Sequence, residues 1–429
     1  MPSVTLRSDL SIRPRDFLDF VQPIHALPQV INQSYKAPAH HYQHHEYQPY
    51  KPPQPRRPQM TKKTIAVVNS SGRQAASFIR VASAVGYNVR AQLRNLDGIV
   101  AQEISALPNV TIFVGDLVNK QTKIVNTELI QAVFQGAQVA FINTTFWGDE
   151  VAIGKALADA AKAVNIQHYI YSSMPDHSKH NPSWPGLPLW SSKAAIEEYV
   201  RQLRLPATFV YTGIYNNNFT SLPYPLFCME LQPDGTFVWQ APFHPDVPLP
   251  WLDAEHDVGP AVLQLIKDGP QKWQGGNRIA LAYEMLSPKE ACRAFARGIG
   301  RPVHYVQGTI EISVKIPSGY QRQLIALEKL FTIGGEDPSQ QPPYFGSYEL
   351  ENSCPREAMM LWEGHRGLEE YAREVFPLEE AANGLTWMTE EEGVIQGGQE
   401  EADGEGDSDS DSDEDVLTMG KRRQEEWLA

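Results

Sequence analysis

Residues 69–75 have the pattern of a turn that binds a phosphate group. Residues 64–68 form an apolar run, as in a buried strand, and Asn69, Gly72 and Ala75 follow at the small positions of an Asn-x-x-Gly-x-x-Ala loop. A helical pattern comes next, so the free N–H groups at its start would face the loop and bind negative charge. The pattern predicts a dinucleotide-binding turn, although an ordinary strand–helix turn can look the same.

Arg94 stands where this kind of fold reads the ribose of a bound nucleotide. The alternating run 89–93 predicts a second strand, and Arg94 and Asn95 follow it. The interval from Gly72 to Arg94 is 22 residues, close to the roughly 20 residues that usually separate the two features. An acid at this place accepts from the 2′-hydroxyl of NAD, whereas a basic residue pairs with the 2′-phosphate of NADP. Arg94 therefore favours NADP, unless it is only a solvated surface arginine.

The lysine of a dehydrogenase is present, but its catalytic tyrosine is not. Dehydrogenases with this arrangement place Tyr-x-x-x-Lys after the fifth strand, where the lysine lowers the pKa of the tyrosine that exchanges the proton. Here Lys193 takes the place of the lysine and Leu189 that of the tyrosine. Leucine cannot donate a proton, so we predict a site that holds a dinucleotide without using it. The remaining candidate acids are Tyr171, Ser172 and His177.

The elements that must position these residues indicate an α/β protein. Strands and helices alternate with short connections, which predicts a Rossmann-type doubly wound parallel sheet, with ligands at the carboxyl ends of its strands. The predicted strands are 64–68, 89–93, 111–114, 139–142, 169–171 and 208–211. Further helical patterns, at 258–267, 287–299, 320–330 and 356–375, predict a smaller mixed α/β C-terminal domain. The aromatic stretch 219–256 is expected to be local core rather than a docking surface.

Composition divides the chain into four parts. Residues 1–59 are rich in Pro, His and Tyr without a sustained period, which predicts a disordered extension. Residues 60–218 are the predicted dinucleotide-binding domain, and 219–388 are the smaller domain that covers the ligand cleft. Residues 389–429 are a predicted disordered acidic tail. No apolar run reaches the length of a membrane span, and three widely spaced cysteines suit a reducing compartment without a metal site.

Most of the acidity lies in the C-terminal tail. Between Glu390 and Asp415 there are 13 carboxylates and no Lys or Arg, and without them the formal net charge of −14 becomes about −1. The nearly neutral body argues against general affinity for nucleic acids. The tail itself is either a solvating segment or a binding site for a cationic partner.

The chain resembles the NmrA-like family of atypical short-chain dehydrogenases/reductases from about residue 62 to 388. The motifs that carry the resemblance are KTIAVVN (63–69), GRQAAS (72–77), FINTT (141–145), HYIYSSMPDH (168–177), GIYNNNFTSLPYPLF (213–227), LDAEHDVGP (252–260) and EYAREVFP (370–377). The resemblance implies a non-catalytic sensor of oxidised NAD or NADP. It also implies a co-regulator in nitrogen metabolite repression that contacts a GATA-type zinc-finger activator, in the nucleus and cytoplasm, without binding nucleic acid or membrane.

The resemblance also implies roles for single residues. Asn69, Ser70, Ser71, Gly72, Arg73 and Gln74 would cradle the pyrophosphate, Arg94 and Asn95 would meet the adenosine ribose or its phosphate, Asn143, Thr144 and Thr145 would line the nicotinamide side, Lys193 would hold the second ribose, and Tyr215, Asn216, Asn217 and Asn218 would close the site. Two other classes of protein compete with this interpretation. One is an NADP-dependent reductase of the isoflavone-reductase-like type, and the other is a scaffold that keeps the fold without a ligand.

Overall fold

The computed structural model describes residues 63–382, except 120, 147, 221–228, 274–276, 311–317, 334 and 336. The predicted extension 1–59 and the predicted acidic tail 389–429 lie outside the described residues. Within the described ranges, no helix has the length and apolar character needed to cross a membrane.

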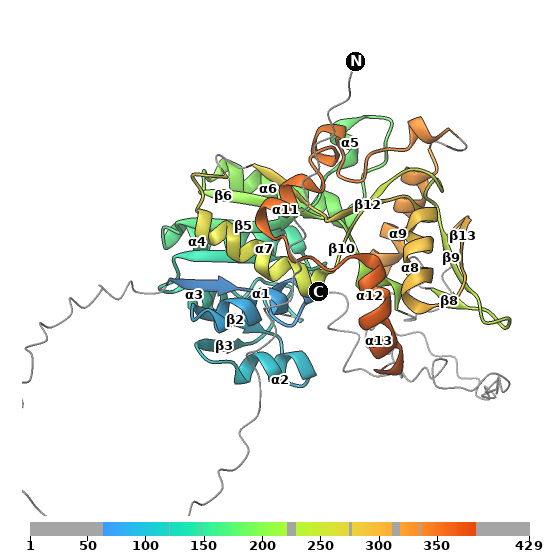
Figure 1. Cartoon of the computed structure of the whole chain (residues 1–429). Coiled ribbons are helices and arrows are strands. Elements are labelled where there is room, and N and C mark those ends of the chain that lie inside the picture. Colours follow the sequence, from blue (N-terminus) through green and yellow to red (C-terminus); the bar gives the residue numbers. More distant parts are fainter. Residues whose placement is uncertain are drawn as a thin grey trace, which may run out of the picture. The chain divides into compact units, whose positions relative to one another are not determined.

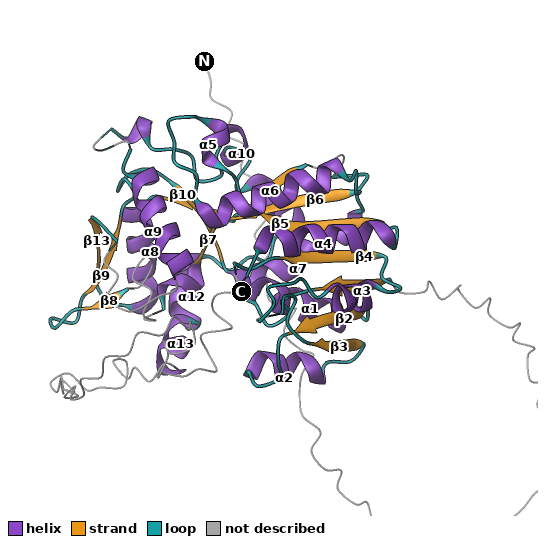
Figure 2. Ribbon diagram, turned by 180° about the vertical axis from the view of Figure 1, so that it is seen from behind, coloured by secondary structure: helices purple, strands orange, loops and turns teal. Residues whose placement is uncertain are grey.

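A seven-stranded parallel sheet carries the predicted dinucleotide site (Figures 1 and 2). Its strand order is β11-β6-β5-β4-β1-β2-β3. The strands are β1 (Thr64–Val67), β2 (Asn88–Leu93), β3 (Val110–Val114), β4 (Val139–Asn143), β5 (His168–Ser173), β6 (Ala207–Thr212) and β11 (Arg278–Leu281). The order reverses between β1 and β4, and this is the place where such sheets bind ligands. The predicted Rossmann-type fold is confirmed.

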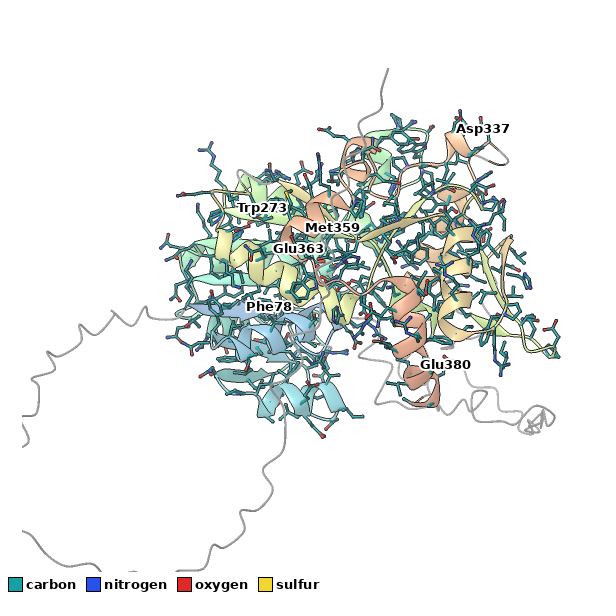
Figure 3. The ribbon with its side chains drawn as sticks, in the orientation of Figure 1. Phe78, Trp273, Asp337, Met359, Glu363 and Glu380 are labelled. Atoms are coloured by element: carbon teal, nitrogen blue, oxygen red, sulfur yellow. The ribbon has the colours of Figure 1, made fainter. Side chains whose placement is uncertain are left out.

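Helices cover both faces of the sheet, which explains why its strands are apolar on both sides. One face packs against α3 (Thr127–Phe134), α4 (Glu150–Ala163) and α6 (Pro188–Gln202). The other packs against α1 (Arg73–Ala84), α2 (Ile99–Ala106) and α7 (Ala254–Asp268). On this second face Phe78, labelled in Figure 3, meets Phe141 of β4 edge-on, with ring centroids 5.3 Å apart.

Helix α7 belongs to the sheet layer although it comes late in the chain. The backbone N of Gly259 donates a hydrogen bond to Ser77 Oγ of α1 at 2.9 Å. A Cβ atom on Gly259 would lie only 2.4 Å from the carbonyl oxygen of Ser77, so glycine permits the close approach of the two helices. Because β11 and α7 both follow residue 218, the sheet layer draws on both of the predicted domains.

Two small sheets and several helices form the rest of the described chain (Figure 1). One sheet joins β7 (Ile214–Tyr215), β10 (Leu249–Leu252) and β12 (Glu284–Leu286), and the other joins β8 (Glu230–Leu231), β9 (Phe237–Ala241) and β13 (Val303–Gln307). Phe219 packs against Trp239, Trp251 and Phe295, at centroid distances of 5.2, 5.2 and 5.3 Å. The described aromatic residues of the stretch 219–256 are thus core residues.

The helices after β12 differ in part from the prediction. They are α8 (Pro288–Ile299), α9 (Ser318–Phe331), α10 (Tyr348–Glu351), α11 (Arg356–Leu361), α12 (Leu368–Glu374) and α13 (Phe376–Ala382), with the short 3-10 turn η2 (Pro338–Gln340). Another 3-10 turn, η1 (Asn216–Phe219), follows β7 earlier in the chain. The single helix predicted over 356–375 is wrong. Residues 362–367 separate α11 from α12, and they contain Gly364 and Gly367, which do not favour a continuous helix.

Candidate functional site

The turn after β1 is held by one buried glutamine. The backbone N of Asn69 donates to Gln92 Oε1 at 2.9 Å, and the backbone N of Ser70 donates to the carbonyl oxygen of Gln92 at 3.0 Å. Gln92 Nε2 in turn donates to the carbonyl oxygen of Gly115 at 2.7 Å. The ends of β1, β2 and β3 are therefore tied together. Sequence reasoning missed Gln92, although an amide inside an apolar strand was a usable indication.

Asn69 connects the turn to the other half of the sheet. Its φ angle is +49°, in the left-handed region that asparagine tolerates better than most residues. Its side-chain Nδ2 donates to the carbonyl oxygen of Asn143, at the end of β4, at 2.7 Å. Asn69, predicted to cradle the pyrophosphate, and Asn143, predicted to line the nicotinamide side, thus meet at the point where the strand order reverses.

The first turn of α1 follows directly after the turn that contains Asn69. The N-cap residue is Gly72, which has no side chain that could cap the helix. The backbone N–H groups of the first helical turn lack intrahelical acceptors, and together with the helix dipole they favour an anion. This geometry fits the predicted cradle for a pyrophosphate at 69–74.

Two predicted site residues carry buried polar atoms that need a partner. Gln74 Nε2 donates to the hydroxyl of Tyr215, while Gln74 Oε1 has no hydrogen-bond partner among the described residues. Asn216 is fully buried, and both polar atoms of its amide lack a partner in the same part of the chain. Buried polar groups without partners are costly and rare in proteins. The pair therefore fits a polar ligand such as a dinucleotide.

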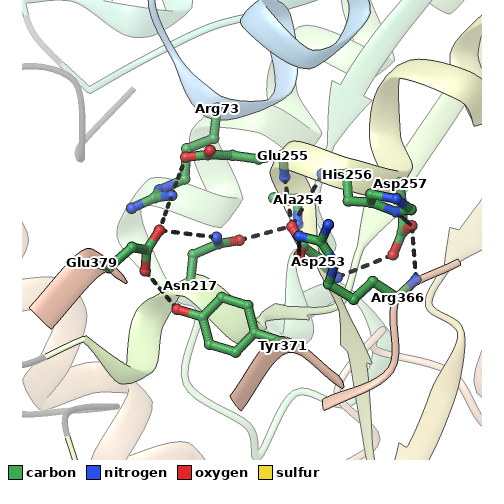
Figure 4. Close-up of polar contacts among 10 residues, drawn as sticks. All are labelled: Arg73, Asn217, Asp253, Ala254, Glu255, His256, Asp257, Arg366, Tyr371 and Glu379. Atoms are coloured by element: carbon green, nitrogen blue, oxygen red, sulfur yellow. Dashed lines mark hydrogen bonds and ion pairs between the residues drawn. The ribbon is translucent and has the colours of Figure 1, made fainter. Parts of the chain in front are cut away.

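Arg73 is held by two acids from distant segments (Figure 4). Its guanidinium pairs with Glu255 in the first turn of α7 and, at 3.4 Å between Nη1 and Oε1, with Glu379 of α13. Glu379 also accepts from Asn217 Nδ2 at 3.4 Å and from the Tyr371 hydroxyl at 2.6 Å. The structure thus joins the predicted residues Arg73 and Asn217 through Glu379. Sequence reasoning missed Glu379 and its neighbours in this group, Glu255 and Tyr371.

Lys193 lies on α6 and is engaged by a buried acid. Its Nζ donates to Glu150 Oε1 at 2.8 Å and also to the carbonyl oxygen of Thr144. Glu150 is the first residue of α4, its side chain is 4% exposed, and it accepts from Thr144 Oγ1 at 2.7 Å. Helix α6 begins at Pro188, so Leu189 and Lys193 share it. Glu150 was not identified from the sequence as a residue of the site.

The other candidate acids are poorly suited to proton transfer. The Tyr171 hydroxyl lies 2.9 Å from Thr144 Oγ1, and burial raises the pKa of this phenol well above its usual value. His177 packs against Trp190 at a centroid distance of 5.7 Å, and burial lowers its pKa to about 4. Ser172 is also buried.

The remaining predicted residues occupy the expected strand ends. Arg94 and Asn95 follow β2, with Arg94 half-buried and Asn95 exposed. Ser71, Thr145 and Asn218 are half-buried, in the turn after β1, after β4 and in η1. Their contacts with a cofactor stay predictions. No group of three or more His, Cys, Asp or Glu in the part of the chain that the structure describes is arranged to hold a metal ion.

Comparisons with known proteins agree on one family. The model of the NmrA-like family matches residues 61–372. The nitrogen metabolite repression protein nmr of Neurospora crassa is 66% identical, over 77% of this chain and 72% of that protein. The corresponding protein nmrA of Emericella nidulans is 57% identical, over 76% of this chain and 99% of that protein.

Solved structures point the same way. Crystal structures of NmrA, a negative transcriptional regulator, in complex with NAD and with NADP are 60% identical to this chain. They cover 76% of this chain and 99% of their own, with TM-scores of 0.71 and 0.70. The chain belongs to the NmrA-like family.

Proposed function

We propose that this protein is a non-catalytic, NAD(P)-binding transcriptional co-regulator that acts as a negative regulator in nitrogen metabolite repression. The names of its relatives in Neurospora and Emericella support the regulatory role. The NmrA complexes with NAD and NADP support dinucleotide binding. In related enzymes the bound dinucleotide exchanges a hydride, whereas here we propose that it serves only as a ligand.

The observation that carries the non-catalytic part is the contact between Lys193 and Glu150. A catalytic lysine lowers the pKa of its tyrosine through an uncompensated positive charge. Lys193 has the Glu150 carboxylate at 2.8 Å instead, and Leu189 stands where the tyrosine would be. A reductase would need another proton donor beside Lys193, and the candidates Tyr171 and His177 are both fully buried.

The chain's own residues suggest how the ligand is held. The turn 69–74 and the start of α1 would bind the pyrophosphate, and Gln74 and Asn216 would supply the polar atoms that lack partners among the described residues. Arg94 would pair with the 2′-phosphate of NADP. We propose that the protein prefers the oxidised dinucleotides, and that it binds NADP at least as tightly as NAD.

The proposed partner is a basic GATA-type zinc-finger activator, contacted by the folded body. Charge complementarity supports α12 as part of the contact through Glu370, which is exposed on it. Its neighbours Glu369 and Glu374 form ion pairs with Arg297 and Arg373. The proposal includes residence in both nucleus and cytoplasm and no direct contact with DNA.

Calorimetric titration tests the proposal. The protein should bind NAD or NADP with a saturable heat signal, and a GATA-type zinc finger should bind in a second titration. Failure of all four dinucleotides, oxidised and reduced, to bind would contradict the sensor role. If dinucleotides bind but the zinc finger does not, the proposed GATA-type partner is wrong.

A further inference from the structure

Glu379 joins α13 to the predicted dinucleotide site through three donors (Figure 4). Arg73 comes from the start of α1, Asn217 from η1 and Tyr371 from α12. The first two belong to the predicted cofactor-binding residues. Helix α13 is the last of the described helices. The carboxylate of its Glu379 contacts Arg73 and Asn217, two side chains that the ligand is expected to contact.

Charge makes this arrangement sensitive to an anionic ligand. The guanidinium of Arg73 has two carboxylates beside it, from Glu255 and Glu379, so the group already carries excess negative charge. Burial raises the pKa of Glu379, an effect that the charge of Arg73 opposes, and the carboxylate therefore depends on this partner. A pyrophosphate on the turn would add negative charge at the start of α1 and attract the same guanidinium.

We propose that the dinucleotide and Glu379 compete for Arg73, so that binding of the dinucleotide loosens α13. This inference rests on the proposed function, because it requires a dinucleotide at the turn 69–74. On binding, Arg73 turns from Glu379 to the pyrophosphate, and Glu379 keeps only its neutral donors, Asn217 and Tyr371. The helix then carries an unbalanced buried carboxylate, which favours its detachment. Occupancy of the site is thereby reported at α13, which follows α12 in the chain, and α12 is where we place part of the contact with the zinc finger.

Hydrogen–deuterium exchange of residues 376–382, with and without NAD, tests the coupling in the full-length protein. We expect NAD to accelerate exchange in this segment. The variant Glu379→Gln should bind NAD about fivefold more tightly, as expected for removal of a partly screened charge. NAD should accelerate exchange of 376–382 less in this variant than in the wild type, because the neutral amide leaves no unbalanced carboxylate on α13. The control is Glu363→Gln, an exposed glutamate labelled in Figure 3, which removes the same charge and should behave as the wild type.

Each other outcome overturns the inference. If NAD binds the wild-type protein but leaves exchange of 376–382 unchanged or slower, the competition is wrong while the proposed function stands. The same holds if Glu379→Gln binds NAD no more tightly than Glu363→Gln does. If the wild-type protein binds no NAD in calorimetry, the inference and the proposed function fail together.

Discussion

The Nζ atom of Lys193 lies 2.8 Å from Oε1 of Glu150, and the two side chains are 16% and 4% exposed. Helices α6 and α4 bring them together at the end of β4, where Thr144 also binds both. In an enzyme of this arrangement the charge of the lysine would act on a tyrosine. Here the charge is balanced by a carboxylate, and the pair contributes to the packing of the two helices.

Replacing Glu150 with glutamine should destabilise the protein. The variant leaves the ammonium of Lys193 without its counter-charge in a poorly solvated place, which should lower the free energy of unfolding by about 2–4 kcal/mol. Urea denaturation measures the loss. The matched control is Glu128→Gln, an exposed glutamate in the first turn of α3. Equal stability of the two variants would show that the ion pair has no structural role.

Gly259→Ala should also destabilise the protein, through the contact of α7 with α1. The added methyl group would collide with the backbone of Ser77, and overpacking of this kind costs about 1–3 kcal/mol. Gly319→Ala, in the first turn of α9 where space is open, should be neutral or slightly stabilising. A thermal unfolding series compares the two. A Gly259→Ala variant as stable as the wild type would contradict the close approach of the helices.

Arg94→Ala should weaken binding of NADP more than binding of NAD. A contact between guanidinium and phosphate is charge-assisted, and its loss should cost about 1–3 kcal/mol of the free energy of NADP binding. Titration of one variant with both cofactors provides its own control. Equal losses would show that Arg94 contributes only general charge or packing.

His177 should make the folded state sensitive to acid. Burial lowers its pKa to about 4, below the value of about 6.5 in an unfolded chain. The unfolded state therefore binds more protons between these values, and stability is complete above about pH 6.5 and falls as the pH drops toward 4. His168, whose pKa burial also lowers to about 4, adds to the effect.

The variant His177→Phe tests this prediction. Its free energy of unfolding should fall less between pH 7 and pH 4.5 than that of the wild type, by about 2–3 kcal/mol. His304→Gln replaces an exposed histidine on β13 and should keep the full dependence. Parallel pH profiles for His177→Phe and the wild type would contradict the assignment.

Removal of residues 389–429 should leave a specific complex with the zinc finger. The tail offers long-range attraction, so its loss should slow association and reduce the dependence on salt. Surface plasmon resonance at two salt concentrations separates rate from affinity. If the truncated protein no longer binds the zinc finger at physiological salt, the tail is the binding element and the body is not.

Strands β1 to β6 could be predicted from sequence, β2 because its residues alternate and the others because their residues are mostly apolar. The start of α6 could not, since its N-cap is Leu187 rather than a residue that caps with its side chain, and only Pro188 marks the first turn. Strand β11 has four residues and pairs with β6, which is distant in sequence. Its place becomes visible only in the assembled sheet.

The residues of the candidate site likewise fall into those that could be predicted from sequence and those that could not. The turn at 69–75 and Lys193 follow from local patterns. Glu379 does not, because it meets Arg73 across 306 positions of sequence, and nothing in the sequence near it points to that contact. Glu150 and Gln92 likewise acquire their roles from neighbours on other elements. Spacing predicts which residues can meet the ligand, whereas tertiary contacts decide which of them are already engaged.

We propose above that the protein binds a dinucleotide and transfers no hydride. The most direct measurement follows NADPH oxidation spectroscopically in a sample whose dinucleotide binding has been established by calorimetry, with a panel of carbonyl and alkene substrates. We expect saturable binding of the dinucleotide and a rate of NADPH oxidation equal to that in buffer alone. Steady oxidation of NADPH above the buffer rate with any of these substrates would contradict it.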